Sequence, residues 1–136
     1  MINNKLTVGI TQGDGNGIGY EVIIKALADA RILDGFTPVI YGSSKIFGFY
    51  RKQIHNLEQL DTYVINSAKD AKVKKINILN CLPDNVYVEP GQATPDSAKS
   101  AITALERAVA DLKSGDIDVL VTGPINKRAM TNAGFG

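Results

Sequence analysis

The sequence predicts an α/β fold with a mostly parallel sheet flanked by helices. Short apolar segments rich in β-branched residues alternate along the chain with longer segments of helical apolar spacing. One of the expected strands, Asp118–Thr122, is a continuous apolar run, which is typical of a strand covered on both faces. Helical segments of this length between strands form βαβ units, and such units place their strands parallel in one sheet.

The first half of the chain contains most of the expected strands. Lys5–Thr11 alternates and leads into a glycine-rich loop, after which a helix is expected over Glu21–Ala28, with Glu21 in the first turn where a carboxylate suits the helix dipole. Ser43 and Ser44 are suited to cap a helix that runs to about His55. The other expected strands are Thr37–Tyr41, Thr62–Asn66, Ile76–Leu79 and Val86–Val88.

The clearest helix is Pro95–Ser114. Thr94 is a suitable N-cap, Pro95 occupies the first helical position, and Gly115 follows as a C-cap glycine. The apolar residues of this helix form one stripe with steps of three and four: Ala101, Ile102, Leu105, Ala108, Val109 and Leu112.

Length and composition exclude several classes of protein. The 136 residues, 44% of them hydrophobic, are enough for one core but not for two. A net charge of +1 gives no reason to expect a nucleic-acid or membrane partner, and no apolar run approaches the length of a membrane span. A single cysteine, Cys81, suits a reducing compartment, so we expect a cytoplasmic protein. The basic residues Lys69, Lys72, Lys74 and Lys75 are expected on a solvated face or loop.

Two loops at the ends of expected strands carry the candidate site residues, because ligands collect beyond the carboxyl ends of parallel strands. The first loop contains Gly13, Asp14 and Gly15. It matches neither the dinucleotide-binding fingerprint nor a P-loop, but it offers backbone N–H groups at a helix N-terminus, which is a general anion site. Asp14 would then hold a hydroxyl, an amine or the turn itself, and a simple tight turn explains the glycines equally well.

The second loop, Gly123–Ala129, contains Asn126 and Lys127 and directly follows Thr122, the last residue of the expected strand. A lysine at this place can meet a phosphate or carboxylate, or donate a proton if it is partly desolvated, although most lysines lie on the surface without a function. Neither a metal site nor a nucleophile–base pair is evident, because the only histidine, His55, and the only cysteine are far apart in the sequence.

Two segments together resemble one enzyme family. ITQGDGNGIGYEV (Ile10–Val22) is similar to the N-terminal signature of 4-hydroxythreonine-4-phosphate dehydrogenases, and GDIDVLVTGPINKRAMTNAGFG (Gly115–Gly136) to their second conserved block. The first segment alone is also similar to the GDGIGPE motif of isocitrate and isopropylmalate dehydrogenases, which share the wider fold. Gly15 and Tyr20 stand where the family usually has proline, and Ala98-Lys99 also departs from the pattern.

The resemblance implies that residues 1–136 are the N-terminal α/β portion of a longer two-domain enzyme. The resemblance further implies an NAD-dependent enzyme with a divalent metal (Zn, Mg or Co), which three histidines from a homodimer hold. Such an enzyme oxidises the alcohol of a phosphorylated hydroxy amino acid to a β-keto acid, and this keto acid then decarboxylates on the route to pyridoxal 5'-phosphate. The metal ligands would lie beyond Gly136, so the chain alone is expected to be inactive and to bind neither NAD nor metal. Lys127 would be the catalytic residue. The residues near substrate and cofactor would be Gly13, Asp14, Gly15, Thr122 and Asn126.

Two alternatives stay open at this stage. One is a related dehydrogenase that acts on 4-phosphothreonate or phosphoerythronate, because such enzymes share these motifs. The other is a non-catalytic anion-binding α/β module.

Overall fold

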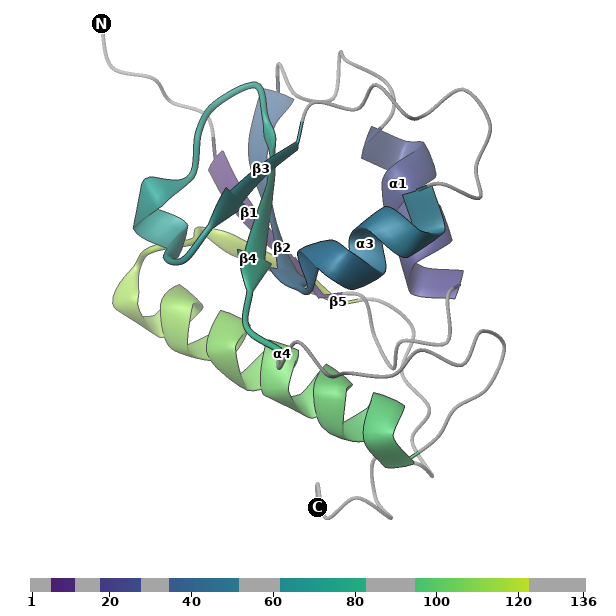
Figure 1. The fold of residues 1–136 in the computed structure, drawn as a ribbon. Coiled ribbons are helices and arrows are strands. Elements are labelled where there is room, and N and C mark those ends of the chain that lie inside the picture. Colours follow the sequence, from purple (N-terminus) through teal and green to yellow (C-terminus); the bar gives the residue numbers. More distant parts are fainter. Residues whose placement is uncertain (1–5, 12–17, 28–34, 52–61, 83–94, 123–136) are drawn as a thin grey trace, which may run out of the picture.

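Five strands form the sheet at the centre of the computed structural model (Figure 1). The structure describes residues 6–11, 18–27, 35–51, 62–82 and 95–122. The strands are β1 (Leu6–Thr11), β2 (Phe36–Gly42), β3 (Thr62–Ile65), β4 (Ile76–Asn80) and β5 (Val119–Thr122). They lie in the order β3-β4-β2-β1-β5, and each neighbouring pair is parallel. The predicted parallel α/β sheet is therefore confirmed.

Within the described residues, three α-helices and one short 3-10 helix accompany the sheet. They are α1 (Ile18–Leu27), α3 (Ser44–Arg51), η1 (Ala68–Asp70) and α4 (Pro95–Ser114). Helix α4 has the predicted bounds, and Gly115 takes the left-handed conformation (φ 85°) expected of a C-cap glycine. The predicted strand Val86–Val88 and the predicted end of the second helix near His55 lie outside the described residues.

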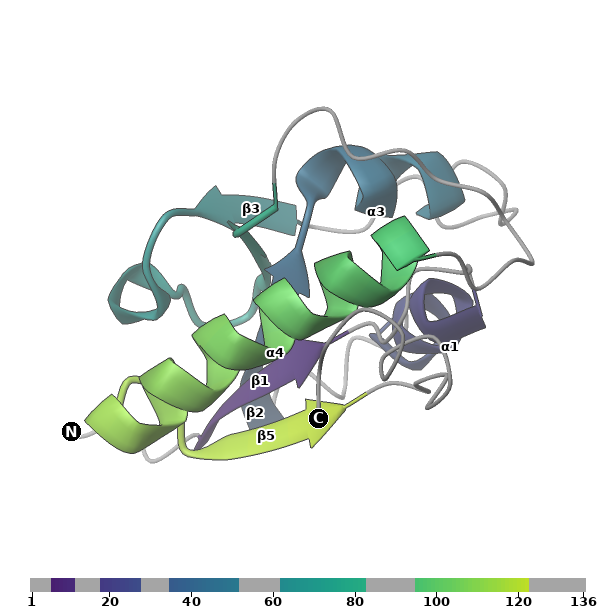
Figure 2. The same ribbon diagram turned by 90° about the horizontal axis from the view of Figure 1, so that it is seen from below.

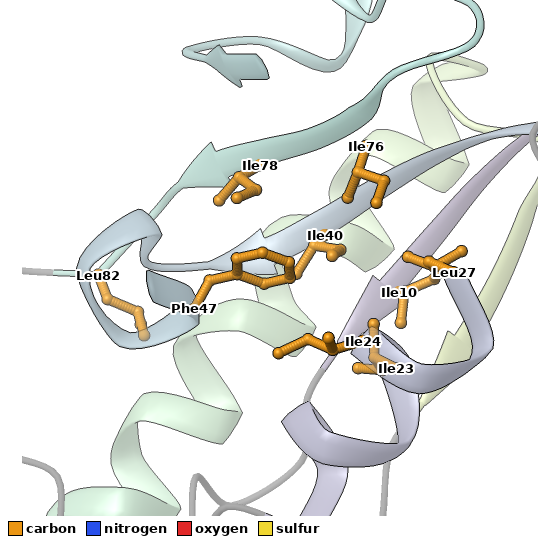
Figure 3. Close-up of a cluster of buried hydrophobic side chains, with 9 residues drawn as sticks. All are labelled: Ile10, Ile23, Ile24, Leu27, Ile40, Phe47, Ile76, Ile78 and Leu82. Carbon is orange, nitrogen blue, oxygen red and sulfur yellow. The ribbon is translucent and has the colours of Figure 1, made fainter. Parts of the chain in front are cut away.

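Helices α1 and α3 cover one face of the sheet, and their side chains form the larger core cluster (Figure 3). Phe47 of α3 and Ile24 of α1 are almost completely buried there, against side chains from β1, β2 and β4. Full burial of a side chain of this size contributes about 1.5–3 kcal/mol. The cluster consists of Ile10, Ile23, Ile24, Leu27, Ile40, Phe47, Ile76, Ile78 and Leu82.

Helix α4 covers the opposite face with a second cluster, which includes Val39, Tyr41, Ile65, Ala68, Leu79, Ala104, Ala108 and Ile117. A polar network also ties the helix to the sheet. The Tyr41 hydroxyl donates to the Asp111 carboxylate at 2.7 Å, and Arg107 lies 3.7 Å from the same carboxylate. Arg107 also donates to the backbone oxygen of Asn66, 3.1 Å away. This face is therefore fixed by directional bonds as well as by apolar packing.

The apolar stripe of α4 divides into two rows in the structure. The alanine row, Ala101, Ala104 and Ala108, is buried against the sheet. Of the larger residues, Ile102, Leu105 and Val109 are only partly buried, and Leu112 is 38% exposed. Because the alanine side chains are small, the helix can approach the sheet closely along this row. The larger apolar residues of the stripe lie beside the row, where they are only partly buried.

Strand β5 corrects one expectation. Its continuous apolar run predicted a strand covered on both faces, but Val119 and Val121 are 41% and 49% exposed. The reason is its position, because β5 lies at the edge of the five-stranded sheet. Val119 and Val121 are paired with Val8 and Ile10 of β1, on the face that carries α1, and no described helix covers that face over β5. Leu120 faces the other way and packs against the α4 cluster.

The connection from β3 to β4 is organised by a buried amide. Asn77 is fully buried, and its Nδ2 lies within hydrogen-bond distance of the backbone oxygens of Pro38, Lys72 and Lys75, while its Oδ1 accepts from the Lys72 N–H. Around this amide, Lys69, Lys72 and Lys74 are exposed, as the basic patch was expected to be. Across the described part of the chain, no helix is both long and apolar enough to span a membrane.

Candidate functional site

The order in which strands are added to the sheet reverses between β1 and β5. After β1 the chain forms α1 on one face and returns as β2, on one side of β1. Helix α4, on the other face, leads instead to β5 on the other side of β1. In open parallel sheets, ligands bind in the crevice beyond the carboxyl ends of the two strands that flank such a switch point. The candidate site therefore lies beyond the ends of β1 and β5.

Thr11 and Thr122 mark this place in the structure. They are the last residues of β1 and β5 and are paired with each other across the two strands. Thr11 is 2% exposed, whereas Thr122 is exposed. At the opposite ends of the two strands, the Thr7 N–H donates to the Asp118 carboxylate at 2.8 Å and the Asp118 N–H donates to the Thr7 oxygen at 2.8 Å. These two bonds fix the register that brings the threonines together.

The structure places one of the six predicted site residues. Thr122 lies at the carboxyl end of β5, as predicted. Gly13, Asp14, Gly15, Asn126 and Lys127 lie outside the described residues. The segments that contain these five residues leave the sheet from Thr11 and Thr122. Sequence reasoning missed Thr11, although its position as the last residue of the first strand gives it the same relation to the edge as Thr122.

Two helices, on opposite faces of the sheet, begin at the end of the sheet where its strands finish. The first residue of α3, Ser44, follows the end of β2 by two positions, and its N–H donates to Oδ1 of Asn80, at the end of β4, over 2.7 Å. Asn80 also donates to the Ser44 hydroxyl at 3.2 Å. The N-terminal end of α4 lies at the same end of the molecule as the arrowheads of β1 and β5 (Figure 2). Helix N-termini carry partial positive charge, so this side of the molecule favours anionic ligands.

Cys81 carries a free thiol near the strand ends, directly after β4. Its N–H donates to the Gly42 oxygen at 3.0 Å. Burial raises the pKa of the Cys81 thiol to about 11, and Arg107 opposes this only in part. Because the thiolate is the reactive form, Cys81 is a structural thiol and not a nucleophile at neutral pH.

A polar hollow of about 420 Å³ lies at the far edge of the sheet, beside β3. It is lined by Tyr63, Val64, Ile65, Asn66, Asp70 and Lys72. The Lys72 ammonium lies 5.2 Å from the centre of the Tyr63 ring, which is a cation–π contact. The hollow is separated from the switch point by the width of the sheet, so it is not part of the candidate site.

No group of three or more His, Cys, Asp and Glu side chains able to hold a metal occurs within residues 6–11, 18–27, 35–51, 62–82 and 95–122. The described residues at the switch point therefore do not fit a divalent metal by themselves. They offer the exposed Thr122 hydroxyl, and the nearby helix N-termini suit the anionic part of a ligand.

Comparison with known proteins identifies relatives of this chain. It is 42% identical over 135 residues to 4-hydroxythreonine-4-phosphate dehydrogenase from Bacteroides thetaiotaomicron, an alignment that covers 99% of this chain and 36% of the relative. It is 29% identical over 142 residues to a Clostridium botulinum protein with the provisional name D-threonate 4-phosphate dehydrogenase, covering 96% of this chain and 39% of that protein. The chain thus spans less than half the length of these relatives.

Solved structures agree with the sequence relatives. The crystal structure of a 4-hydroxythreonine-4-phosphate dehydrogenase from Burkholderia phymatum superposes with a TM-score of 0.84 at 29% identity, covering 97% of this chain and 40% of that one. The enzyme of the same name from Klebsiella pneumoniae superposes with a TM-score of 0.82 at 26% identity, covering 97% and 41%. The family model described as pyridoxal phosphate biosynthetic protein PdxA matches residues 34–136. This chain therefore belongs to the PdxA family.

Proposed function

We propose that this chain is the N-terminal α/β portion of a two-domain, NAD-dependent 4-hydroxythreonine-4-phosphate dehydrogenase of the cytoplasm. The observation that carries the proposal is the 42% identity to an enzyme of that name over nearly the whole chain. The pairing of Thr11 with Thr122 at the switch point supports it, because it provides the strand-end crevice that such a site needs.

In this proposal the chain forms one wall of a substrate pocket. The loops after β1 and β5 would approach the phosphorylated hydroxy amino acid and the nicotinamide, with Gly13, Asp14, Gly15, Thr122 and Asn126 near them. Lys127 would serve as the catalytic residue, either by pairing with an anionic group or by moving a proton.

The described residues do not supply a metal site. In the complete protein, the histidines that hold the divalent metal would lie in the part that aligns with the remainder of the relatives, which this chain does not span. The homodimer would bring those ligands together. Residues 1–136 alone would then lack turnover.

The experiment compares residues 1–136 with the protein encoded by the complete reading frame. NADH formation is followed with 4-hydroxythreonine 4-phosphate and Mg²⁺, Zn²⁺ or Co²⁺. Activity of the complete protein, without activity of residues 1–136, is the expected result. Lys127→Ala in the complete protein should lower kcat/KM by about 100-fold or more, in the range for general acid–base groups. Lys69→Ala, which changes an exposed lysine of the β3–β4 connection, is the matched control and should leave kcat/KM unchanged.

Three results would contradict the proposal: turnover by residues 1–136, an inactive complete protein that is folded, or a Lys127→Ala variant with an unchanged rate. The first would show that our account of the missing metal ligands is wrong. The second would favour a non-catalytic anion-binding module. The third would indicate that Lys127 is a surface lysine without a catalytic function.

A second substrate is supported by the relatives named for D-threonate 4-phosphate at 29% identity. The same assay with 4-phosphothreonate and with phosphoerythronate separates these activities. The substrate with the highest kcat/KM identifies the reaction, and the higher identity to the Bacteroides enzyme favours 4-hydroxythreonine 4-phosphate.

A further inference from the structure

The Thr11 hydroxyl is a buried polar group at the switch point. Thr11 is 2% exposed, and among the described residues the structure shows no hydrogen bond to its hydroxyl. The buried amide of Asn77, by contrast, has partners for both its oxygen and its nitrogen. A buried hydroxyl without a partner costs about 1–3 kcal/mol, and valine would fill the same space without this cost. Packing alone therefore does not explain a threonine at this position.

Strand geometry decides which side chains lie beside this hydroxyl. Ile10 belongs to the cluster under α1 and α3, and successive side chains of a strand point to opposite faces, so Thr11 lies on the α4 face. Its register partner on β2, Tyr41, belongs to the α4 cluster. Its register partner on β5 is Thr122, which lies on the α4 face as well, because Leu120 two residues earlier packs against the α4 cluster.

The two threonines are close enough to interact. They are paired across β1 and β5, which run side by side with their arrowheads at the same end (Figure 2). Neighbouring strands lie about 4.7–4.9 Å apart, and paired threonines on one face can bond through their hydroxyls. On the other side of Thr11, the Tyr41 hydroxyl already donates to Asp111. Thr122 is therefore the register partner that the Thr11 hydroxyl can bind.

The two hydroxyls differ in exposure. Thr122 is exposed, so a ligand in the strand-end crevice can reach it, whereas almost no surface of Thr11 is open to a ligand. Helix N-termini at this end of the sheet favour an anionic group. A hydroxyl has one proton to donate and two lone pairs to accept, so Thr122 can donate to an anionic oxygen and accept from Thr11 at the same time.

We propose that Thr11 is a positioning residue that acts through Thr122. When an anionic oxygen of the phosphorylated substrate binds, the Thr122 hydroxyl donates to it and accepts a hydrogen bond from the Thr11 hydroxyl, which gains the partner that it lacks in the free protein. Hydrogen bonds in such a chain polarise and strengthen each other. Substrate binding thus removes the cost of an unpaired buried hydroxyl. The inference rests on the proposed function, in which Thr122 lies near the substrate.

The first experiment measures the kinetic constants of the complete protein with 4-hydroxythreonine 4-phosphate. Thr11→Val keeps the shape of the side chain and should raise KM for this substrate by about tenfold, the effect of losing one hydrogen bond, with little change in KM for NAD. Thr11→Ser keeps the hydroxyl and should have a KM near that of the wild type. Thr37→Val is the matched control and should leave both KM values unchanged. Thr37 is the other buried threonine among the described residues, near the start of β2.

The second experiment tests whether Thr11 acts through Thr122 with a double-mutant cycle. Thr122→Val removes the group that would meet the substrate and should raise KM by at least about tenfold. In Thr11→Val/Thr122→Val, the loss of the Thr11 hydroxyl should add little to the effect of Thr122→Val. Residues that act independently would instead multiply their effects on KM.

The third experiment separates positioning from a structural role without measuring turnover. Thermal unfolding of the complete protein is followed with and without substrate. Without substrate, Thr11→Val should unfold at the same temperature as the wild type or higher, because it removes an unpaired buried hydroxyl. With substrate, the increase in Tm should be smaller for Thr11→Val than for the wild type, because the variant binds substrate more weakly.

Four results would overturn the inference. They are an unchanged KM in Thr11→Val, an equal rise of KM in Thr37→Val, multiplied effects in the double variant, and a Tm of free Thr11→Val below that of the wild type. The proposed function fails separately. A folded wild-type protein without turnover contradicts that function, whereas an active wild type with any of the four results contradicts only the role of Thr11.

Discussion

Gly9 of β1 lies where Ile117, in the connection from α4 to β5, and Tyr41 of β2 leave no room for a side chain. A Cβ at this position would lie 2.5 Å from Cδ1 of Ile117 and 3.0 Å from Cε1 of Tyr41. Ile117 is 1% exposed and Tyr41 is fully buried, so neither side chain is free to move into solvent. The hydrogen bond from the Tyr41 hydroxyl to Asp111 restrains the ring further. We therefore predict that Gly9→Ala destabilises the fold.

The size of the effect follows from two opposing contributions. Forcing an extra carbon into a packed core costs about 1–3 kcal/mol. Alanine also restricts the unfolded chain, which offsets about 0.5–1 kcal/mol. Gly9 does not have the positive φ that would make alanine strained in itself, so the loss is steric. The expected net decrease in the free energy of unfolding is about 1–2 kcal/mol.

A second substitution tests whether the named contact is the cause. Ile117→Val removes Cδ1, the atom closest to the added Cβ, and alone should cost about 1 kcal/mol by leaving a small cavity. In the double variant Gly9→Ala/Ile117→Val the new methyl group occupies part of that space. The double variant should therefore be more stable than the sum of the single effects predicts, by about 1 kcal/mol.

Urea unfolding followed by circular dichroism measures all of these free energies. Gly48→Ala is the control, because nothing lies within 4 Å of a Cβ at Gly48 in α3, and alanine there should stabilise by about 0.5–1 kcal/mol. If Gly9→Ala is as stable as the wild type, or if the two single effects simply add, the close approach of Gly9 to Ile117 is not what the structure indicates.

Three further predictions follow from buried polar groups and from strand register. Asn77→Ala leaves the Lys72 N–H and nearby carbonyls without their partner and should cost about 2–4 kcal/mol in urea unfolding, whereas the exposed Asn66→Ala should change little. Burial raises the pKa of Cys81 in the folded state from 9.0 to about 11, so the stability contributed by its protonated form is complete below pH 9 and is lost as the pH rises toward 11. The free energy of unfolding of Cys81→Ala should therefore fall less than that of the wild type over this pH interval. An equal fall in both proteins would contradict the assignment. Asp118→Ala removes the acceptor of the Thr7 N–H and should cost about 1 kcal/mol, with faster hydrogen exchange at the Thr7 amide, while unchanged exchange would show that the carboxylate does not hold the register.

Local signals explain why much of the fold could be predicted from the sequence. Helix α4 carries its own boundary residues, with Pro95 at its start and Gly115 after its end, and the structure has the same bounds. The strands of the sheet were found from short runs of apolar and β-branched residues. Such signals are contained within a few consecutive residues, so no knowledge of the tertiary fold was needed.

Features that depend on distant residues could not be predicted in this way. The apolar stripe of α4 gave no sign that its alanines would be buried while Leu112 is exposed, because this depends on how closely the helix approaches the sheet. The exposure of Val121 depends on the position of β5 in the sheet order. The bond between Ser44 and Asn80 joins residues 36 positions apart. For the candidate site, the sequence predicted that it lies at the carboxyl ends of the strands and includes Thr122. It did not predict that Thr11 is paired with Thr122 across β1 and β5.

The two ends of this sheet are free to change to different degrees over evolutionary time. At the end where the strands begin, the Asp118 carboxylate binds the Thr7 N–H of β1, and the buried Asn77 amide binds the Lys72 N–H of the β3–β4 connection. Substitutions of these residues would therefore disturb the architecture. At the other end, β1 and β5 finish at the paired Thr11 and Thr122. In folds of this kind, binding residues collect on the loops that follow the strand ends, so a lineage can change the ligand that it recognises while the scaffold stays the same. Relatives named for two different phosphorylated compounds align with this chain along nearly all of its length, as expected where one scaffold carries different sites.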